Sequence, residues 1–241
     1  MWQSDDSFND CIIRFLAVQR LGCTEAPLSY WLLRGTLHVK RRWVTERGLW
    51  LESGTDTLAL TRAIERIRAA EVEALVPGDG SLLVVLKPGT SPGEVLSRLL
   101  ESEVEAHTGE LEGSTHTIRA VYGGEAGPDL AIVAAAAGLT TRQCVELHTS
   151  AEFRVAFLGF QPGFAYLEGT PKALQTDRRS TPRVRIPAGS LALGGGYTGI
   201  YPGVSAGGWL VIGRTSEWLF NPNRTPPARF APGDRVRFLA A

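Results

Sequence analysis

The chain has 241 residues, of which 44% are hydrophobic and 21% are charged, a composition typical of globular proteins with one or two domains. Basic and acidic residues balance at 25 each, so the net charge gives no reason to expect a nucleic acid or a membrane as partner. Three cysteines without a CxxC pair or zinc-ligand spacing, and an N-terminus without the positive charge of a signal peptide, predict a reducing cytoplasmic location and no metal site.

The first 45 residues contain apolar clusters but no sustained period of two or 3.6 residues. We interpret them as an uncertain N-terminal extension. They are either a small helical segment or the product of a start site placed too far upstream, and no function is assigned to them.

Residues 46–115 are expected to form a small α+β domain. The spacing of Leu60, Ile64 and Ile67 places three apolar side chains on one face of a helix. The sequence SPGE at residues 91–94 combines a capping box with proline at the first helical position, which marks the start of another helix. In chain order, the predicted elements are a strand at 49–51, a helix at 57–70, a β-hairpin at 73–86 around the turn PGDG, and a helix at 91–100.

Residues 116–241 are expected to form a β-domain, either a barrel or a closed sandwich, that also contains two short helices. Short strands separated by regular glycine and proline turns are typical of such folds. The predicted elements are a strand at 116–122, helices at 128–137 and 141–148, and strands at 153–160, 183–186, 190–193, 209–213 and 235–239.

Residues 157–213 combine glycine, proline, aromatic residues and arginine more densely than an ordinary core requires. Glycine is selected where φ is positive or where another group approaches the backbone closely, and proline fixes turns. We therefore interpret this segment as the functional half of the protein. Its aromatic side chains are candidates for a stacking platform, although core packing explains at least half of them; they are Phe160, Phe164, Tyr166, Tyr197, Tyr201 and Trp209.

The sequence GGGYTG at residues 194–199 matches the GxGxxG pattern of dinucleotide-binding loops. Pro202 follows closely and opposes the helix that such a loop needs, so a glycine-rich turn between strands is the simpler interpretation. A third interpretation is a nest of backbone amides that binds an anion such as phosphate or carboxylate.

Four arginines lie close to these glycines in the sequence. Arg183 and Arg185 are two residues apart on a predicted strand, so they share a face and are expected to grip one anion together. A solvated strand face is the alternative, and we prefer that alternative for Arg178 and Arg179. The sequence around them lacks the longer basic run of a nucleic-acid site.

Two further side chains are candidates for chemistry. His148 is expected at the junction between a helix and the strand that leads to GFQPGF, which makes it the preferred general acid or base; a core histidine or a helix C-terminal charge explains it equally well. Glu125 lies in the loop YGGEAGPDL, where no structural role explains it. Asp129 is explained by its position in the first turn of the following helix.

Five segments follow one another in the order and spacing of a known family: YGGEAGPDL (122–130), ELHTSAEFRVAFLGFQPGFAYLEG (146–169), TPRVRIPAGS (181–190), GGYTGIYP (195–202) and GGWLVIGRT (207–215). They resemble the family that contains the B component of 5-oxoprolinase, allophanate hydrolase subunit 1 and the KipI-type kinase inhibitors. The resemblance covers about residues 48–238. Ala165 and Tyr197 differ from the residues most common in the family, and Tyr197 lacks the side-chain amide of the usual glutamine.

The resemblance implies an α+β chain in which a small α/β domain precedes a cyclophilin-like β-barrel. It also implies a sister subunit of similar fold (the C component of 5-oxoprolinase), together with the A component, and the ATP-dependent opening of 5-oxo-L-proline, a small-molecule substrate, to L-glutamate. ATP is the implied cofactor, but no P-loop identifies its site, so the component that binds it is left open.

Residues and resemblance together give one set of candidate site residues. The catalytic candidates are His148, Arg183, Arg185 and Glu125. Developing negative charge on the lactam needs cations and amide donors, which these arginines and the amides of 194–199 would supply. The substrate-binding candidates are Phe160, Pro162, Gly163, Phe164, Gly194, Gly195, Gly196, Tyr197, Thr198 and Tyr201.

Two alternative functions stay open. One is a carboxyltransferase component of urea or allophanate metabolism; since Met1 is the only methionine, this chain has no Met-Lys-Met site for covalent biotin. The other is a non-catalytic, KipI-like inhibitor of a sensor histidine kinase.

Overall fold

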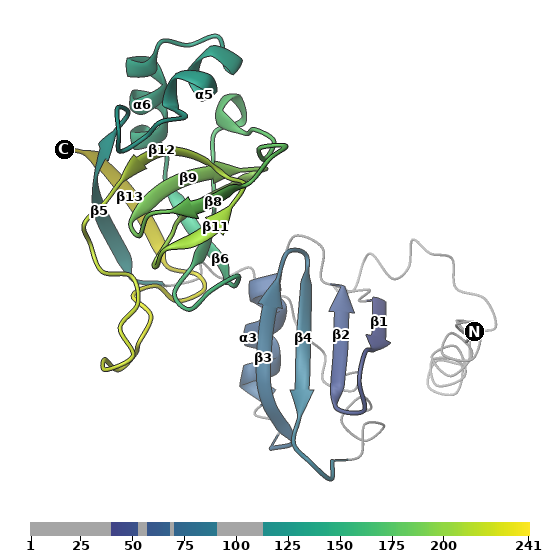
Figure 1. Ribbon diagram of the computed structural model, residues 1–241. Coiled ribbons are helices and arrows are strands. Elements are labelled where there is room, and N and C mark those ends of the chain that lie inside the picture. The colour runs from purple at the N-terminus through teal and green to yellow at the C-terminus, as the bar shows by residue number, and fades with distance from the viewer. Residues whose placement is uncertain (1–39, 53–56, 68–69, 91–112) are drawn as a thin grey trace, which may run out of the picture.

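The computed structural model describes residues 40–52, 57–67, 70–90 and 113–241, which form a four-stranded sheet with one helix and a closed seven-stranded barrel (Figure 1). The expected α+β class with a barrel is confirmed. The helix predicted at 91–100 and the first 39 residues lie outside the described residues.

The four-stranded sheet is antiparallel, in the order β1-β2-β4-β3, and α3 packs on one of its faces. Its side chains alternate as the sequence predicts: Leu82, Val84 and Leu86 of β4 are buried and meet Leu60 and Ile64 of α3. β1 lies within the segment 1–45, where no strand is expected. The elements are β1 (Lys40–Trp43), β2 (Gly48–Glu52), α3 (Thr57–Ile67), β3 (Val72–Gly78) and β4 (Ser81–Leu86).

The barrel closes in the strand order β10-β7-β6-β13-β5-β12-β9, so none of these strands is left as an open edge. The C-terminal strand β13 runs parallel to β5 and antiparallel to β6, which ties the end of the chain between them. The strands are β5 (Thr115–Tyr122), β6 (Phe153–Leu158), β7 (Ala165–Glu168), β9 (Ser190–Gly194), β10 (Tyr197–Ile200), β12 (Leu210–Arg214) and β13 (Arg235–Ala240). A separate two-stranded sheet pairs β8 (Arg183–Ile186) with β11 (Ser205–Gly207).

One predicted strand is shorter than expected, and three strands were not predicted. The strand expected at 153–160 ends at Leu158, because Phe160 adopts a positive φ. Strands β7 and β10 are present where none was expected, and so is β11. They have only three or four residues each and lie among turn-forming glycines, which conceals their alternation.

Helices α5 (Leu130–Ala136) and α6 (Thr141–Ser150) lie together at one end of the barrel (Figure 1). A capping box starts α6: the amide of Gln143 donates to Thr140 Oγ1 at 3.2 Å, and the amide of Thr140 donates to Gln143 Oε1 at 2.9 Å. Cys144 is fully buried in the barrel core, as expected for a structural thiol. In the part of the chain described, no single helix suffices by length and apolarity to cross a membrane; α5 and α6, bent by 88°, pass that test only as a pair.

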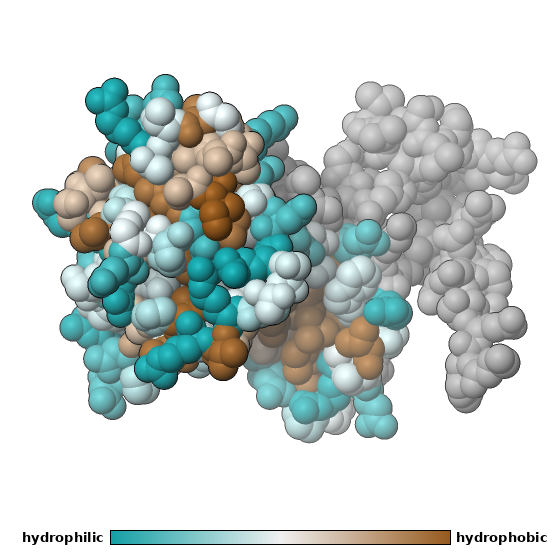
Figure 2. All heavy atoms as spheres, turned by 45° about the horizontal axis from the view of Figure 1, so that its top comes forward, coloured by the Kyte–Doolittle hydropathy of each residue, from teal (hydrophilic) through white to brown (hydrophobic). Residues whose placement is uncertain are grey.

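Side chains of β9 and β10 point alternately to two faces of the barrel wall. Leu191, Leu193 and Ile200 enter the main core, whereas Ala192 belongs to a second cluster with Phe164, Ile186, Tyr201, Trp209 and Val211. Figure 2 shows that hydrophobic residues interrupt the polar surface in several places. The second cluster carries the candidate site.

Candidate functional site

Seven aromatic side chains form a continuous group on this second face, which we call the aromatic surface: Phe157, Phe160, Phe164, Tyr166, Tyr197, Tyr201 and Trp209. Phe157 and Tyr166 are stacked at 4.3 Å between centroids, and the other pairs meet edge to face. Two glycines make room for it. A Cβ at Gly194 would lie 2.5 Å from the Trp209 ring, and one at Gly199 would lie 2.8 Å from the Phe164 ring.

Phe160 is the most unusual member of the aromatic surface. Its φ is 64° and its side chain is 61% exposed, although a left-handed backbone costs a non-glycine residue about 1–2 kcal/mol. The loop is held by hydrogen bonds from the amide of Gly159 to Phe164 O (3.1 Å) and from the amide of Phe164 to Gln161 O (3.0 Å). Backbone strain that presents an exposed aromatic ring is typical of a binding surface.

Pro162 and Gly163 form the tip of that loop. Gly163 has a φ of 80°, and a Cβ there would lie 2.6 Å from Phe220 Cβ. The Nε2 atom of Gln161 is buried and has no hydrogen-bond partner within the described residues. The predicted substrate-binding residues Phe160, Pro162, Gly163 and Phe164 are thus neighbours in one fixed loop.

The phenols of Tyr166 and Tyr201 lie next to a cation. Arg178 Cζ stands 5.9 Å from the centroid of the Trp209 ring. Burial raises the pKa of Tyr166, and the positive charge of Arg178 opposes that rise. Burial also raises the pKa of Tyr201. A backbone hydrogen bond from Trp209 and the positive charge of Arg178 both oppose this rise. Both phenols are therefore protonated at neutral pH.

Tyr197 connects the barrel to the four-stranded sheet. Its hydroxyl donates to Asp79 Oδ1 at 2.7 Å, in the turn between β3 and β4. Burial and then this hydrogen bond raise its pKa. Tyr197, which replaces the family's usual glutamine, therefore uses its hydroxyl in a hydrogen bond within the chain.

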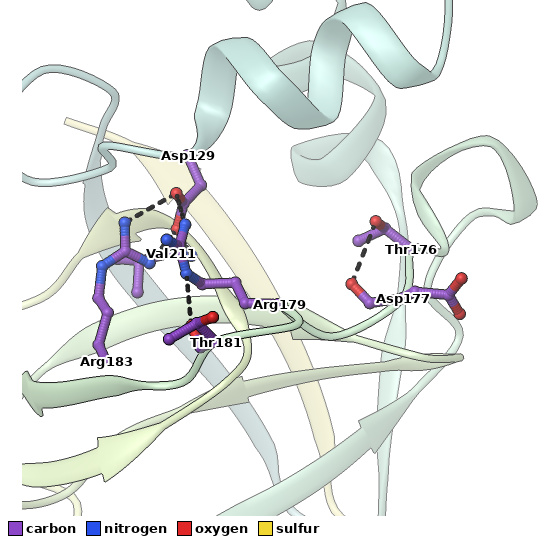
Figure 3. A network of polar contacts seen from close by, with 7 residues as sticks. All are labelled: Asp129, Thr176, Asp177, Arg179, Thr181, Arg183 and Val211. Carbon is purple, nitrogen blue, oxygen red and sulfur yellow. Dashed lines mark hydrogen bonds and ion pairs between the residues drawn. The ribbon is translucent and has the colours of Figure 1, made fainter.

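Arg183 forms an ion pair with the buried carboxylate of Asp129 (Figure 3). Asp129 is 1% exposed and accepts from Arg183 Nη1 at 2.6 Å, Arg183 Nη2 at 2.8 Å, Arg179 Nη1 at 3.2 Å and the Val211 amide at 2.7 Å. The hydrogen bond to Asp129 raises the pKa of Arg183. Asp129 is the N-cap residue of α5, at the helix terminus expected from sequence, but its side chain makes no cap hydrogen bond and accepts from the arginines and the Val211 amide instead.

The structure does not bring Arg183 and Arg185 to a common site. Arg185 is exposed and makes no hydrogen bond or ion pair with the described part of the chain. Alternation along β8 predicts only that the two side chains share a face of the strand. It does not reveal that Asp129, 54 residues before Arg183, is the anion that one of them binds.

His148 lies in the barrel interior rather than on the aromatic surface. It is 0% exposed, and burial lowers its pKa to about 3, so it is neutral at neutral pH. Its Nδ1 atom is hydrogen-bonded to the hydroxyl of Tyr122 at 2.9 Å, and its Nε2 atom lies 3.4 Å from Thr198 Oγ1. Thr198 also pairs with Thr170 at 2.9 Å. The imidazole thus belongs to a buried polar chain, the alternative that sequence analysis left open.

Glu125 is exposed in the turn between β5 and α5, and it forms no hydrogen bond or ion pair with the residues described. The structure does not link it to the aromatic surface. Its catalytic role stays a prediction.

The glycine motif at 194–199 is the β9–β10 hairpin, and no helix follows it. Gly195 has a φ of 61°, and its amide donates to Thr176 O at 2.8 Å. That amide is therefore not free to join an anion nest, while Gly196 at the tip is exposed. The simplest of the three interpretations, a turn between strands, is the one observed.

Among the residues that the structure describes, no second cluster competes with the aromatic surface as a site for chemistry. Within the described ranges, no group of three or more His, Cys, Asp or Glu side chains is placed to hold a metal ion. A hollow of about 500 Å³ opens on the four-stranded sheet, beside the β1–β2 turn and lined by residues 44–48 with Leu83 and Val85. It contains none of the candidate residues.

Comparison with known proteins identifies relatives across most of the chain. The family described as "Carboxyltransferase domain, subdomain C and D" matches residues 42–230. Three curated relatives are named as the B component of 5-oxoprolinase. Identity is 48% for that of Escherichia coli O157:H7, 41% for Haemophilus influenzae and 40% for Bacillus subtilis. The alignments cover 70%, 60% and 62% of this chain and 77%, 68% and 63% of the relatives, in the same order.

Solved structures share the fold. The crystal structure of TTHA0988 has a TM-score of 0.69 at 35% identity over 81% of this chain, which spans 40% of that longer chain. The conserved uncharacterized protein PH0987 from Pyrococcus horikoshii has a TM-score of 0.52 at 36% identity, with 84% of this chain and 97% of that chain covered. Kluyveromyces lactis urea amidolyase has a TM-score of 0.65 at 17% identity, over 84% of this chain and 15% of that chain. This last likeness concerns the fold alone, and it agrees with a cyclophilin-like barrel.

Proposed function

Because the chain belongs to the family of the carboxyltransferase domain, subdomain C and D, we propose that it is the B component of an ATP-dependent 5-oxoprolinase. The observation that carries the proposal is its 48% identity to the E. coli relative that bears this name, over 77% of that protein. The complex would open the lactam of 5-oxo-L-proline to L-glutamate. A sister barrel protein, the C component, and a third protein, the A component, would complete it.

The aromatic surface is the part of this chain that we assign to the substrate. A lactam ring is flat and polar at its edge, so aromatic faces and edges bind it well. The Tyr166 hydroxyl makes no hydrogen bond within the described residues and stays protonated, because burial raises its pKa. It is therefore a donor for the carbonyl oxygen of the bound lactam, and this hydrogen bond would orient the ring before that oxygen is activated.

ATP would supply the driving force by activating that same oxygen as a phosphate ester. One water then adds across the C–N bond and a second releases phosphate, which gives L-glutamate, ADP and inorganic phosphate. The chain carries no P-loop motif, so we assign the ATP site to no residue here. We propose that the role of this chain is to bind the lactam ring and to donate a hydrogen bond to its carbonyl oxygen.

A reconstitution with each component omitted in turn tests the proposal. This chain is co-purified with its two partner proteins, and release of L-glutamate from 5-oxo-L-proline and ATP is measured. The proposal predicts turnover that disappears when this chain is left out. Full activity without it, or none with all three present, would contradict the proposal and would favour the kinase-inhibitor or carboxyltransferase alternatives.

A further inference from the structure

One arginine beside the aromatic surface is not neutralised by a carboxylate of the described residues. Arg179 and Arg183 are paired with Asp129, and Arg154 is paired with Glu168. Arg178 is exposed, its Cζ lies over the Trp209 ring, and it forms no ion pair with the residues that the structure describes. The sequence predicts a solvated position for Arg178, and its side chain is exposed; of the two arginines expected to bind an anion, Arg183 is paired with Asp129.

The backbone fixes Arg178 in this position. The amide of Arg179 donates to Gly208 O at 2.7 Å, which joins the arginine segment to the residue before Trp209. A Cβ at Gly208 would lie 3.8 Å from Arg178 Cβ, so the base of the arginine side chain runs directly beside Gly208. The indole is held in turn by its contacts with Phe164 and Tyr166, at 5.4 and 5.5 Å between centroids. The guanidinium thus stands at a defined edge of the aromatic surface.

The chemistry of a guanidinium beside an aromatic ring indicates its ligand. A guanidinium that lies over an aromatic ring uses its face for that contact, and its N–H groups remain directed outward in its plane. A carboxylate pairs with two such N–H groups at once. The positive charge of Arg178 also reaches Tyr166, whose hydroxyl makes no hydrogen bond within the described residues. A carboxylate receptor and a neutral hydrogen-bond donor therefore both lie next to the Trp209 ring.

We propose that Arg178 and Tyr166, over Trp209, form a binding site for a small carboxylate that also carries a flat amide. On the proposed function, on which this identification rests, the ligand is 5-oxo-L-proline. Its carboxylate lies on Arg178 and its lactam carbonyl faces Tyr166. Arg178 then determines specificity for the acid over the neutral lactam.

Two ligands and matched variants test the site. Equilibrium dialysis measures binding of 5-oxo-L-proline and of 2-pyrrolidinone, the same lactam without the carboxylate, to the complete complex without ATP. Arg178→Gln should weaken the binding of 5-oxo-L-proline by about 10- to 100-fold, the size expected for the loss of charge-assisted hydrogen bonds. The same variant should leave the binding of 2-pyrrolidinone unchanged. Tyr166→Phe should weaken both ligands by the same factor, because both carry the carbonyl. Arg178→Lys should recover part of the loss.

The matched control is Arg224→Gln. Arg224 Cζ lies 4.3 Å from the Trp218 ring centroid, so this variant removes the same kind of arginine–tryptophan contact at a pair of residues outside the proposed site. It should leave the binding of both ligands unchanged. Thermal unfolding of each variant complex shows that the fold is retained, and Arg178→Lys serves if Arg178→Gln unfolds.

The outcomes separate the inference from the proposed function. An Arg178→Gln complex that binds 5-oxo-L-proline normally, or that loses both ligands equally, overturns the inference even when the wild-type complex turns over. Absence of 5-oxo-L-proline binding to the wild-type complex overturns it as well. Carboxylate-dependent binding that is lost in Arg178→Gln supports the inference even if no L-glutamate is released, and in that case the proposed function alone fails.

Discussion

Asp129 is the position where the structure allows the sharpest prediction of a loss of stability. The substitution Asp129→Asn keeps the shape of the side chain but removes its charge. In the native protein, the Asp129 carboxylate accepts two hydrogen bonds from Arg183, one from Arg179 and one from the Val211 amide. The asparagine keeps one acceptor oxygen, but its NH2 group faces the guanidinium groups. Because a guanidinium has only N–H donors and no acceptor, it cannot form a hydrogen bond with that NH2 group.

The magnitude follows from burial. Removal of one partner from a buried ion pair costs about 3–5 kcal/mol. Asp129 is 1% exposed, but the side chains of Arg179 and Arg183 are 32% and 26% exposed and regain water when released. We therefore expect the lower end, a loss of about 3 kcal/mol in the free energy of unfolding. For a chain of this length, that loss lowers the melting temperature by about 6–12 °C.

Urea unfolding followed by circular dichroism measures this change, and calorimetry gives the melting temperature. The control is Arg237→Gln, which opens the pair between Arg237 and Glu152 at 2.8 Å, whose side chains are 60% and 46% exposed. That variant should lose at most about 1 kcal/mol. If Asp129→Asn stays within the same range as the control, the view of Asp129 as the anchor of the arginine segment is refuted.

Three further predictions concern the barrel. Burial holds the pKa of His148 at about 3 against 6.5 for a free histidine. The unfolded chain therefore takes up the proton first, and stability falls by about 1.4 kcal/mol per pH unit from about pH 6 towards 3. His148→Gln should reduce the slope of urea-unfolding free energy between pH 6 and 4, and equal slopes would contradict this. Gly194→Ala should cost about 2 kcal/mol, because its Cβ would lie 2.5 Å from the Trp209 ring, whereas Gly196→Ala, 3.9 Å from its nearest neighbour, should be tolerated. Guanidinium unfolding compares the two glycine variants, and equal losses would count against the contact. Phe160→Gly relieves the positive φ and should leave stability unchanged or raise it by about 1 kcal/mol, while turnover of the complex falls; a stability loss above that amount would show a packing role instead.

Sequence patterns predicted those elements whose burial alternates over enough residues. The buried Leu82, Val84 and Leu86 of β4 and the apolar face of α3 are such cases. The short strands β7, β10 and β11 have too few residues for a period to show, and the glycines around β10 make it resemble a turn. The family resemblance stated from five motifs is confirmed by the match over residues 42–230.

Part of the candidate site was likewise predictable from the sequence, and part was not. The density of glycine and aromatic residues in 157–213 located the aromatic surface, because Gly194 and Gly199 are there to admit Trp209 and Phe164. The roles of the arginines were not readable, since they depend on Asp129, which lies 50 and 54 residues before its two arginine partners. Local spacing describes which side chains share a face, but it does not describe which charges meet across the fold.

The central claim is that the lactam lies on the aromatic surface of this chain, and photochemical crosslinking tests it most directly. A 5-oxo-L-proline analogue that carries a diazirine is bound to the complete complex, irradiated and mapped by mass spectrometry. We predict adducts on this chain within residues 157–166 or 197–209, and we expect unlabelled 5-oxo-L-proline to reduce their formation by competition. Adducts confined to the partner proteins, or on this chain only outside those two segments, would contradict it.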